Sequence, residues 1–206
     1  MNKKQSIYSV HPGVKMIQDW VSALPQKTGK TLEEWVAILK KEGPQDPKER
    51  QSWLKENYQF GTNAAWWIAD YADGKSPWEG DAKSYLLAAE SYVEKMFSGS
   101  KSGLKPLYDK ILEAALSLAS DVKICPCKTI VPLYRNHVFA QIKPRTKTQL
   151  VLGFALQKTP FTQRLIDTGG GAKKDRITHC VAITKLSDID AEVHLWLKTA
   201  YQLDVK

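Results

Sequence analysis

The chain has 206 residues, of which 43% are hydrophobic, and 30 lysine and arginine residues against 22 aspartate and glutamate residues give a formal net charge of +8. This content is enough to bury a core in one or two domains, and three cysteines, an odd number, do not fit the disulfide framework of a secreted scaffold. No apolar stretch approaches the ~20 residues of a membrane span, and the start MNKKQSIYSV lacks a signal-peptide core, so we expect a cytoplasmic protein with no membrane partner.

The first part of the chain carries helix signals. A helix is expected near residues 14–24, and Thr31 with Glu34 three residues later forms a capping box that opens the next one. Two more short helices follow before Asp73, and together they predict a short helical core at about residues 26–73. Among its tryptophans, Trp66 falls off the apolar stripe of its helix, so it is available to cover either the other domain or a partner.

A change of period marks the second half. A connecting helix over residues 81–97 completes a helical module of residues 1–98, and the sequence SGSKSG at residues 98–103 is a linker. Residues 99–206 then predict a helix, an antiparallel β-meander and a final helix, so the fold class is α+β. The predicted helices and strands of this domain are helix 104–119, strands 128–134, 137–143, 147–154 and 177–184, and a helix capped by Ser187 with Asp190.

The positive charge is concentrated on this meander. Residues 121–180 contain 11 basic and 3 acidic side chains, whereas residues 1–98 contain 13 of each. A concentrated positive field attracts anions, so a polyanion is the first partner to consider.

A two-residue turn at Arg135-Asn136 sets the expected faces of the first hairpin. It pairs Tyr134 with His137, Pro132 with Phe139 and Lys128 with Lys143. The proline, which cannot donate to a neighbour, indicates a strand at the sheet edge. The residues expected to face the core are Thr129, Val131, Leu133, Val138, Ala140, Ile142, Leu150, Leu152 and Phe154.

The opposite, outer face predicts a binding surface for nucleic acid or another anion. Its candidate residues are Lys128, Tyr134, Phe139, Gln141, Lys143, Arg145, Lys147 and Gln149. Lysines facing one another across a sheet repel, and rings among cations suit single-stranded nucleic acid, whose bases stack while its phosphates meet the charges. The alternative is a solvated face, because a one-sided sheet exposes polar residues to water and lysines protect its edges.

Three other patterns are weaker. The sequence DTGGGAKKD at residues 167–175 places glycines before lysines as a phosphate cradle does, but it lacks P-loop spacing and precedes a strand, which favours a mobile basic loop. Cys125, Cys127, His179 and Cys180 are four potential zinc ligands without zinc-finger spacing. Asp121 with Gln141-Ile142-Lys143 is similar to part of a metal-dependent nuclease site, where magnesium needs at least two carboxylates.

Two stretches resemble bacterial families of uncharacterised domains. TGKTLEEWVAILKKEG with WLKENYQFG resembles a short helical domain of unknown function. KTIVPLYRNHVFAQIKPRTKTQLVLGFAL with THCVAITKLSDIDAEVHLWLKTAY resembles a second uncharacterised domain often found behind the first, whose relatives are labelled predicted transport proteins. The two resemblances cover about residues 26–73 and 104–202 and imply no established activity or catalytic residue.

The leading hypothesis is an uncharacterised cytosolic protein that binds single-stranded RNA or DNA, or another polyanion, through the outer sheet face. Lys143, Arg145 and Lys147 contact phosphates in this hypothesis, and Tyr134 and Phe139 stack on bases. The alternative is a protein-interaction adaptor with no nucleic-acid role and a protein partner on the helical module. In it, either the N-terminal helices cover the sheet or both surfaces bind an acidic partner. A metal-dependent nuclease is third. The sequence leans against an enzyme, and we expect no catalytic residue, cofactor or metal.

Overall fold

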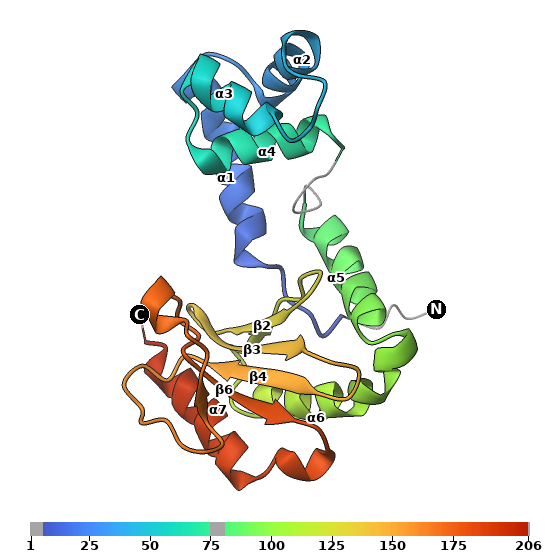
Figure 1. Ribbon diagram of the computed structural model, residues 1–206, viewed down its shortest axis with the longest axis vertical. Coiled ribbons are helices and arrows are strands. Elements are labelled where there is room, and N and C mark those ends of the chain that lie inside the picture. The colour runs from blue at the N-terminus through green and yellow to red at the C-terminus, as the bar shows by residue number, and fades with distance from the viewer. Residues whose placement is uncertain (1–5, 75–80, 206) are drawn as a thin grey trace. The chain divides into compact units, whose positions relative to one another are not determined.

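The computed structural model describes residues 6–74 and 81–205, and Figure 1 shows their course. The chain divides into two compact units, Val10–Tyr85 and a second unit that joins Met1–Ser9 to Leu86–Lys206. This division places residues 86–98, which the sequence analysis grouped with the helical module, in the second unit. Helices followed by an antiparallel sheet and a last helix confirm the predicted α+β class.

The first unit is helical. Its helices are α1 (Pro12–Thr28), α2 (Leu32–Glu42), α3 (Arg50–Tyr58) and α4 (Thr62–Ala72), and α5 (Ala82–Met96) begins at its end. The predicted capping box is confirmed, because the N–H of Glu34 donates to Thr31 Oγ1 at 3.2 Å and the N–H of Thr31 donates to Glu34 Oε2 at 2.7 Å. These two bonds satisfy donors that the first turn of α2 would otherwise leave free.

Aromatic side chains fill the core of this unit. The ring of Trp35 meets the edges of Tyr58 and Phe60, with both centroid distances 4.9 Å, and Leu39 and Leu54 are fully buried beside it. Such edge contacts add to the free energy gained by removing the rings from water. The helical unit therefore has a core of its own.

The second unit contains one six-stranded antiparallel sheet with the order β1-β2-β3-β4-β6-β5. Its strands are β1 (Lys123–Ile124), β2 (Val131–Tyr134), β3 (Val138–Pro144), β4 (Leu150–Phe154), β5 (Ile166–Asp167) and β6 (His179–Ile183). Its helical elements after α5 are η1 (Gly99–Leu104), α6 (Lys105–Leu116), η2 (Gly171–Lys173), η3 (Leu186–Asp188) and α7 (Ala191–Leu203). The stretch expected to be a linker is thus a 3-10 turn between α5 and α6.

One face of the sheet is the core of this unit, and α6 and α7 pack on it (Figure 1). The buried strand residues on this face are Val131, Leu133, Ala140, Ile142, Leu150, Leu152, Phe154, Val181 and Ile183. This confirms the predicted core face for the strand residues except Val138, which is half-buried; Thr129, before β2, is exposed. Alternation of apolar residues with period two explains why this face was readable from the sequence.

The turn between β2 and β3 differs from the prediction. Pro132 pairs with Gln141 and Leu133 with Ala140, but the next pair is Tyr134 with Val138, so β3 has one extra residue at this point. The expected two-residue turn and its register are therefore wrong. A β-bulge of this kind leaves one residue unpaired and turns it out of the regular alternation.

The extra residue is Phe139, and its predicted place on the outer face is also wrong. Phe139 is fully buried and meets the ring of Tyr201 on α7 edge-on, with centroids 5.7 Å apart. Because the bulge turns this ring into the core, it cannot stack on a base. Tyr134 is half-buried, and burial raises the pKa of its hydroxyl to about 12.

The predicted sheet edge and open outer face need correction too. β1 lies outside β2, and the N–H of Cys125 donates to the carbonyl of Pro132, so β2 is an inner strand. In the middle of the outer face, Ile177 lies so close to Gly153 that an added Cβ would come within 2.6 Å of its Cγ2. Only part of the outer face is left for a ligand.

Candidate functional site

Four lysines line one surface pocket of about 530 Å3, which we call the lysine cavity. Lys95 lies in the last turn of α5, Lys101 in η1, Lys128 in the loop before β2, and Lys143 near the end of β3. The remaining lining residues carry no charge and are Met96, Ser98, Ser100, Thr129 and Pro144. Three separate stretches of the chain therefore contribute lysines to one pocket.

Short hydrogen-bonded turns position these stretches. The hydroxyl of Ser98 donates to the carbonyl of Lys95 at 2.9 Å, and the carbonyl of Ser98 accepts from the N–H of Lys101 at 3.1 Å. The N–H of Cys127 donates to the carbonyl of Ile130 at 2.8 Å and closes the turn that carries the third lysine. The fourth lysine is held by the β3–β4 ladder, where it pairs with Val151. These hydrogen bonds fix the backbone segments that carry the four lysines.

The charge of the lysine cavity is not balanced from within. No acidic side chain lines it, and within residues 6–74 and 81–205 no ion pair includes any of its four lysines. Charges of one sign in a shared pocket repel, so a bound anion lowers the free energy of the arrangement. The cavity can hold an anionic group that accepts several hydrogen bonds, as a phosphate does.

The structure brings together only some of the predicted site residues. Lys128 and Lys143 share the lysine cavity, and Lys143 and Arg145 share a second pocket on the outer face. Lys147 is exposed, and Gln141 and Gln149 are half-buried; none of these three lines either pocket.

Sequence reasoning missed Lys95 and Lys101. Both lie in segments that the sequence assigned to a helix and a linker outside the sheet. No local pattern connects residues 95–101 with residues 128–144, because their proximity depends on how α5 and η1 pack against the sheet.

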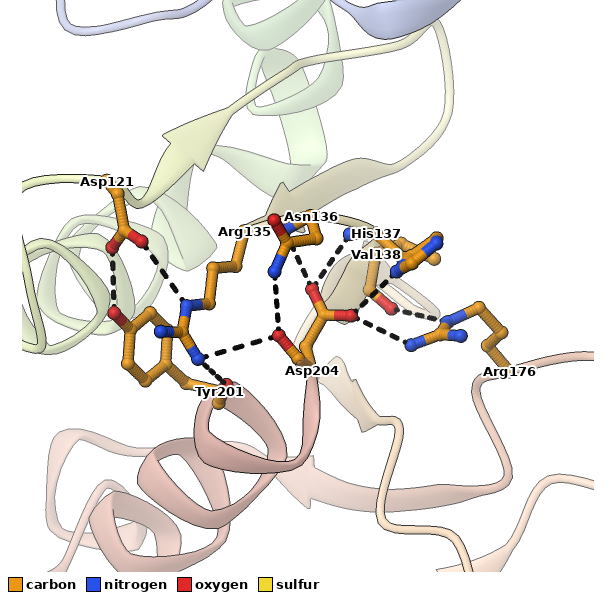
Figure 2. Close-up of polar contacts among 8 residues, drawn as sticks. All are labelled: Asp121, Arg135, Asn136, His137, Val138, Arg176, Tyr201 and Asp204. Atoms are coloured by element: carbon orange, nitrogen blue, oxygen red, sulfur yellow. Dashed lines mark hydrogen bonds and ion pairs between the residues drawn. The ribbon is translucent and has the colours of Figure 1, made fainter. Parts of the chain in front are cut away.

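The other end of β3 holds a buried carboxylate, shown in Figure 2. Asp204, which follows α7, is 1% exposed, and its Oδ2 accepts the backbone N–H of Asn136 at 2.9 Å and of His137 at 2.8 Å. Its Oδ1 lies 2.9 Å from Nδ1 of His137 and accepts from the guanidinium of Arg176 at 3.0 Å. A buried carboxylate is stable only with such a set of donors, so this cluster joins the C-terminal end of α7 to the bulged hairpin.

Arg135 adds a second connection at the same turn (Figure 2). Its guanidinium lies 4.4 Å from the ring centroid of Tyr201 and donates to Asp121 at 3.3 Å, while the Tyr201 hydroxyl donates to Asp121 at 2.8 Å. The hydrogen bond from Tyr201, followed by the guanidinium, holds the pKa of Asp121 below its ordinary value. These contacts engage the carboxylate that the sequence analysis weighed as a metal ligand.

The other metal and phosphate candidates are also engaged. Across the described parts of the chain, no three His, Cys, Asp or Glu side chains cluster as metal ligands would. Both ring nitrogens of His179 have partners, Thr178 Oγ1 and the carbonyl of Thr159, each at 2.8 Å. Burial raises the pKa of Cys125 to about 12 and that of Cys127 to about 11, which disfavours the thiolate that metals bind.

The glycine-rich loop before β6 is held by its own hydrogen bonds. Thr168 Oγ1 donates to the carbonyl of Ile177 at 2.7 Å and accepts the N–H of Gly170 at 3.1 Å. The N–H of Asp175 donates to the carbonyl of Gly170 at 2.9 Å. These bonds occupy polar groups that a phosphate cradle would direct at a ligand.

Each of the two parts of the chain matches a protein family. A family described as a domain of unknown function (DUF5655) matches residues 93–204, and a second domain of unknown function (DUF4287) matches residues 17–74. No curated protein and no solved structure matches the chain. Separately, every helix within the described residues is too short or too polar to cross a membrane.

Proposed function

Because this chain belongs to the DUF5655 family, whose function is unknown, we propose a function from the site itself: the chain binds a phosphate-bearing polyanion through the lysine cavity. The single observation that carries this proposal is the meeting of Lys95, Lys101, Lys128 and Lys143 with no acidic lining residue. Clustered cations with no carboxylate among the lining residues attract and retain anions.

The alternative reading of these lysines is a solvated surface that only keeps the protein dispersed. Isolated surface lysines fit that reading, since they are spread over a face and cost little. The four lysines instead converge on one pocket of about 530 Å3 from segments that are far apart in the sequence. Convergence of like charges costs folding free energy, and a bound anion offsets this cost.

Salt dependence of binding tests the proposal. A fluorescently labelled single-stranded oligonucleotide is titrated with the protein at several salt concentrations, and anisotropy reports the affinity. Four lysine–phosphate contacts predict a slope of roughly −2.8 for log affinity against log salt, because each contact releases part of a counterion. No measurable binding at 50 mM salt, or a slope near zero, would refute the proposal.

The helical unit supports a second candidate function, a contact with a protein partner. On α4 the side chain of Trp66 is 38% exposed, whereas that of its neighbour Trp67 is 7% exposed. Large exposed aromatic side chains are enriched where proteins bind one another. A photo-crosslinker at position 66 should capture one partner reproducibly, and an equal yield from exposed position 40 would reject this surface.

A further inference from the structure

A second pocket of about 390 Å3 lies beside the lysine cavity, and the two share Lys143. Its other lining residues are Arg145, Val151, Ile166, Asp167, Thr168 and Cys180. We call it the platform pocket, because its floor is the outer face of the sheet.

The floor of the platform pocket is apolar. Val151 stands next to Lys143 on the paired strand β4, and Cys180 and Ile166 form the neighbouring cross-strand pair on β6 and β5. Ile166 is 42% exposed, so this floor has apolar surface that a flat ring would cover. Covering apolar surface with an aromatic ring removes it from water and favours binding.

The two pockets differ in charge. The lysine cavity has four cations and no carboxylate, whereas the platform pocket has Lys143, Arg145 and the carboxylate of Asp167. A uniformly charged chain such as polyphosphate would bring negative charge against that carboxylate. A ligand with a phosphate at one end and an uncharged ring with N–H groups at the other fits both pockets.

We infer that the two pockets together bind a nucleotide unit of a single-stranded nucleic acid. The phosphate lies among the lysines, and the base covers Val151 and Ile166. Asp167 Oδ1 accepts the N–H of Gly169 at 2.7 Å, and its other oxygen accepts a hydrogen bond from the exocyclic amino group of the base, as carboxylates do from the N4 amino group of cytosine. This inference rests on the proposed function and adds the ligand class and a preference among bases.

The test compares strands that carry equal charge but differ in their bases. Anisotropy competition is run with oligo-dC, oligo-dT and an abasic strand with the same number of phosphates. Oligo-dC should bind about tenfold more tightly than the abasic strand, and oligo-dT should lie between them because thymine lacks the amino group. Equal affinity for all three strands would overturn the inference while leaving polyanion binding intact, and no binding of any strand would refute both.

Two variants assign the roles of the floor and the carboxylate. I166S should abolish most of the advantage of base-bearing strands over the abasic strand, and L195S, at a site 60% exposed on α7, is the matched control. D167N should weaken the dC preference, because a neutral amide oxygen replaces the charged acceptor, and it should raise the affinity for inorganic polyphosphate several-fold, because a repulsive charge is lost. A D167N protein that keeps the dC preference and the wild-type polyphosphate affinity would contradict the assigned role.

Discussion

The two ends of strand β3 differ in whether their charged side chains have partners of opposite charge. Before its first residue, the buried Asp204 is surrounded by backbone N–H groups and by the side chains of His137 and Arg176. Near its last residue, Lys143 and three other lysines meet in a pocket lined by no carboxylate. Charge that is neutralised within the fold stabilises it, whereas charge left unbalanced is available to a ligand.

This contrast separates two uses of basic residues that the sequence alone does not distinguish. Arg135 and Arg176 count toward the positive charge of residues 121–180, yet they form ion pairs with Asp121 and Asp204 of the same chain. Lys128 and Lys143 come from the same segment and line the lysine cavity. The charge of a segment therefore overstates its capacity to bind anions.

The largest effect on stability is expected at the neutralised end. D204A should lower the free energy of unfolding by about 3 kcal/mol, because it leaves the N–H groups of Asn136 and His137 and the guanidinium of Arg176 without their buried acceptor. Urea unfolding measures this loss. D109A, which breaks an exposed pair with Lys105, is the control and should cost about 0.5 kcal/mol or less. Equal losses in the two variants would show that the Asp204 cluster does not hold α7 to the hairpin.

An intermediate loss of stability is expected at Gly153, which pairs with Gln141 between the two ends of β3. G153A should cost about 1–2 kcal/mol, because its Cβ would lie 2.6 Å from Ile177 Cγ2 and 3.2 Å from Gln141 Cγ. Thermal unfolding measures the change, and G103A, whose Cβ would have no neighbour within 4 Å, serves as the control. If G153A unfolds like the wild type, Ile177 does not cover the middle of the outer face as described.

A smaller effect of opposite sign is expected at the unbalanced end. K128Q/K143Q should raise the free energy of unfolding by about 0.5 kcal/mol at low salt in an anion-poor buffer, because it relieves repulsion between like charges. The gain should vanish at 1 M salt, where screening acts within about 3 Å. A destabilised double variant would mean that these lysines are already balanced in the free protein.

The smallest effect concerns pH at the neutralised end. Hydrogen bonding from Tyr201 lowers the pKa of Asp121 in the folded chain from its ordinary value of 3.8. The unfolded chain then takes up a proton first on acidification, so the stabilising contribution is present above about pH 4 and is lost as the pH falls through the lowered pKa. D121N should therefore show a shallower loss of stability between pH 4 and pH 2 in urea titrations. An identical acid profile for both proteins would show that the contacts of Asp121 contribute nothing to the pH dependence of stability.

Most of the fold was predictable because local patterns decide it. Thr31 and Glu34 define a helix start within four residues, and the alternation of Ile142 with its neighbours fixes which side faces the core. The position of Phe139 was not predictable from such patterns. The hairpin turn is bound by Asp204, which lies 68 residues from Asn136, and the bulge beside it reverses the direction of that ring.

The candidate site was predictable only in part for the same reason. The basic meander indicates Lys128 and Lys143, because their segment concentrates charge. Lys95 and Lys101 join them through the packing of η1 and the end of α5, which leaves no periodic signal in the sequence. The tertiary arrangement, more than the composition, decides which cations meet.

The most direct test removes equal charge from the two ends of β3 and measures binding of one labelled single-stranded oligonucleotide. K128Q/K143Q and R135Q/R176Q each remove two positive charges, and circular dichroism confirms that both proteins are folded at the assay temperature. K128Q/K143Q should weaken binding at least roughly tenfold, or about 1.4 kcal/mol, while R135Q/R176Q should bind like the wild type. Equal weakening in both variants would show that only total charge matters and would contradict the division between neutralised and available charge.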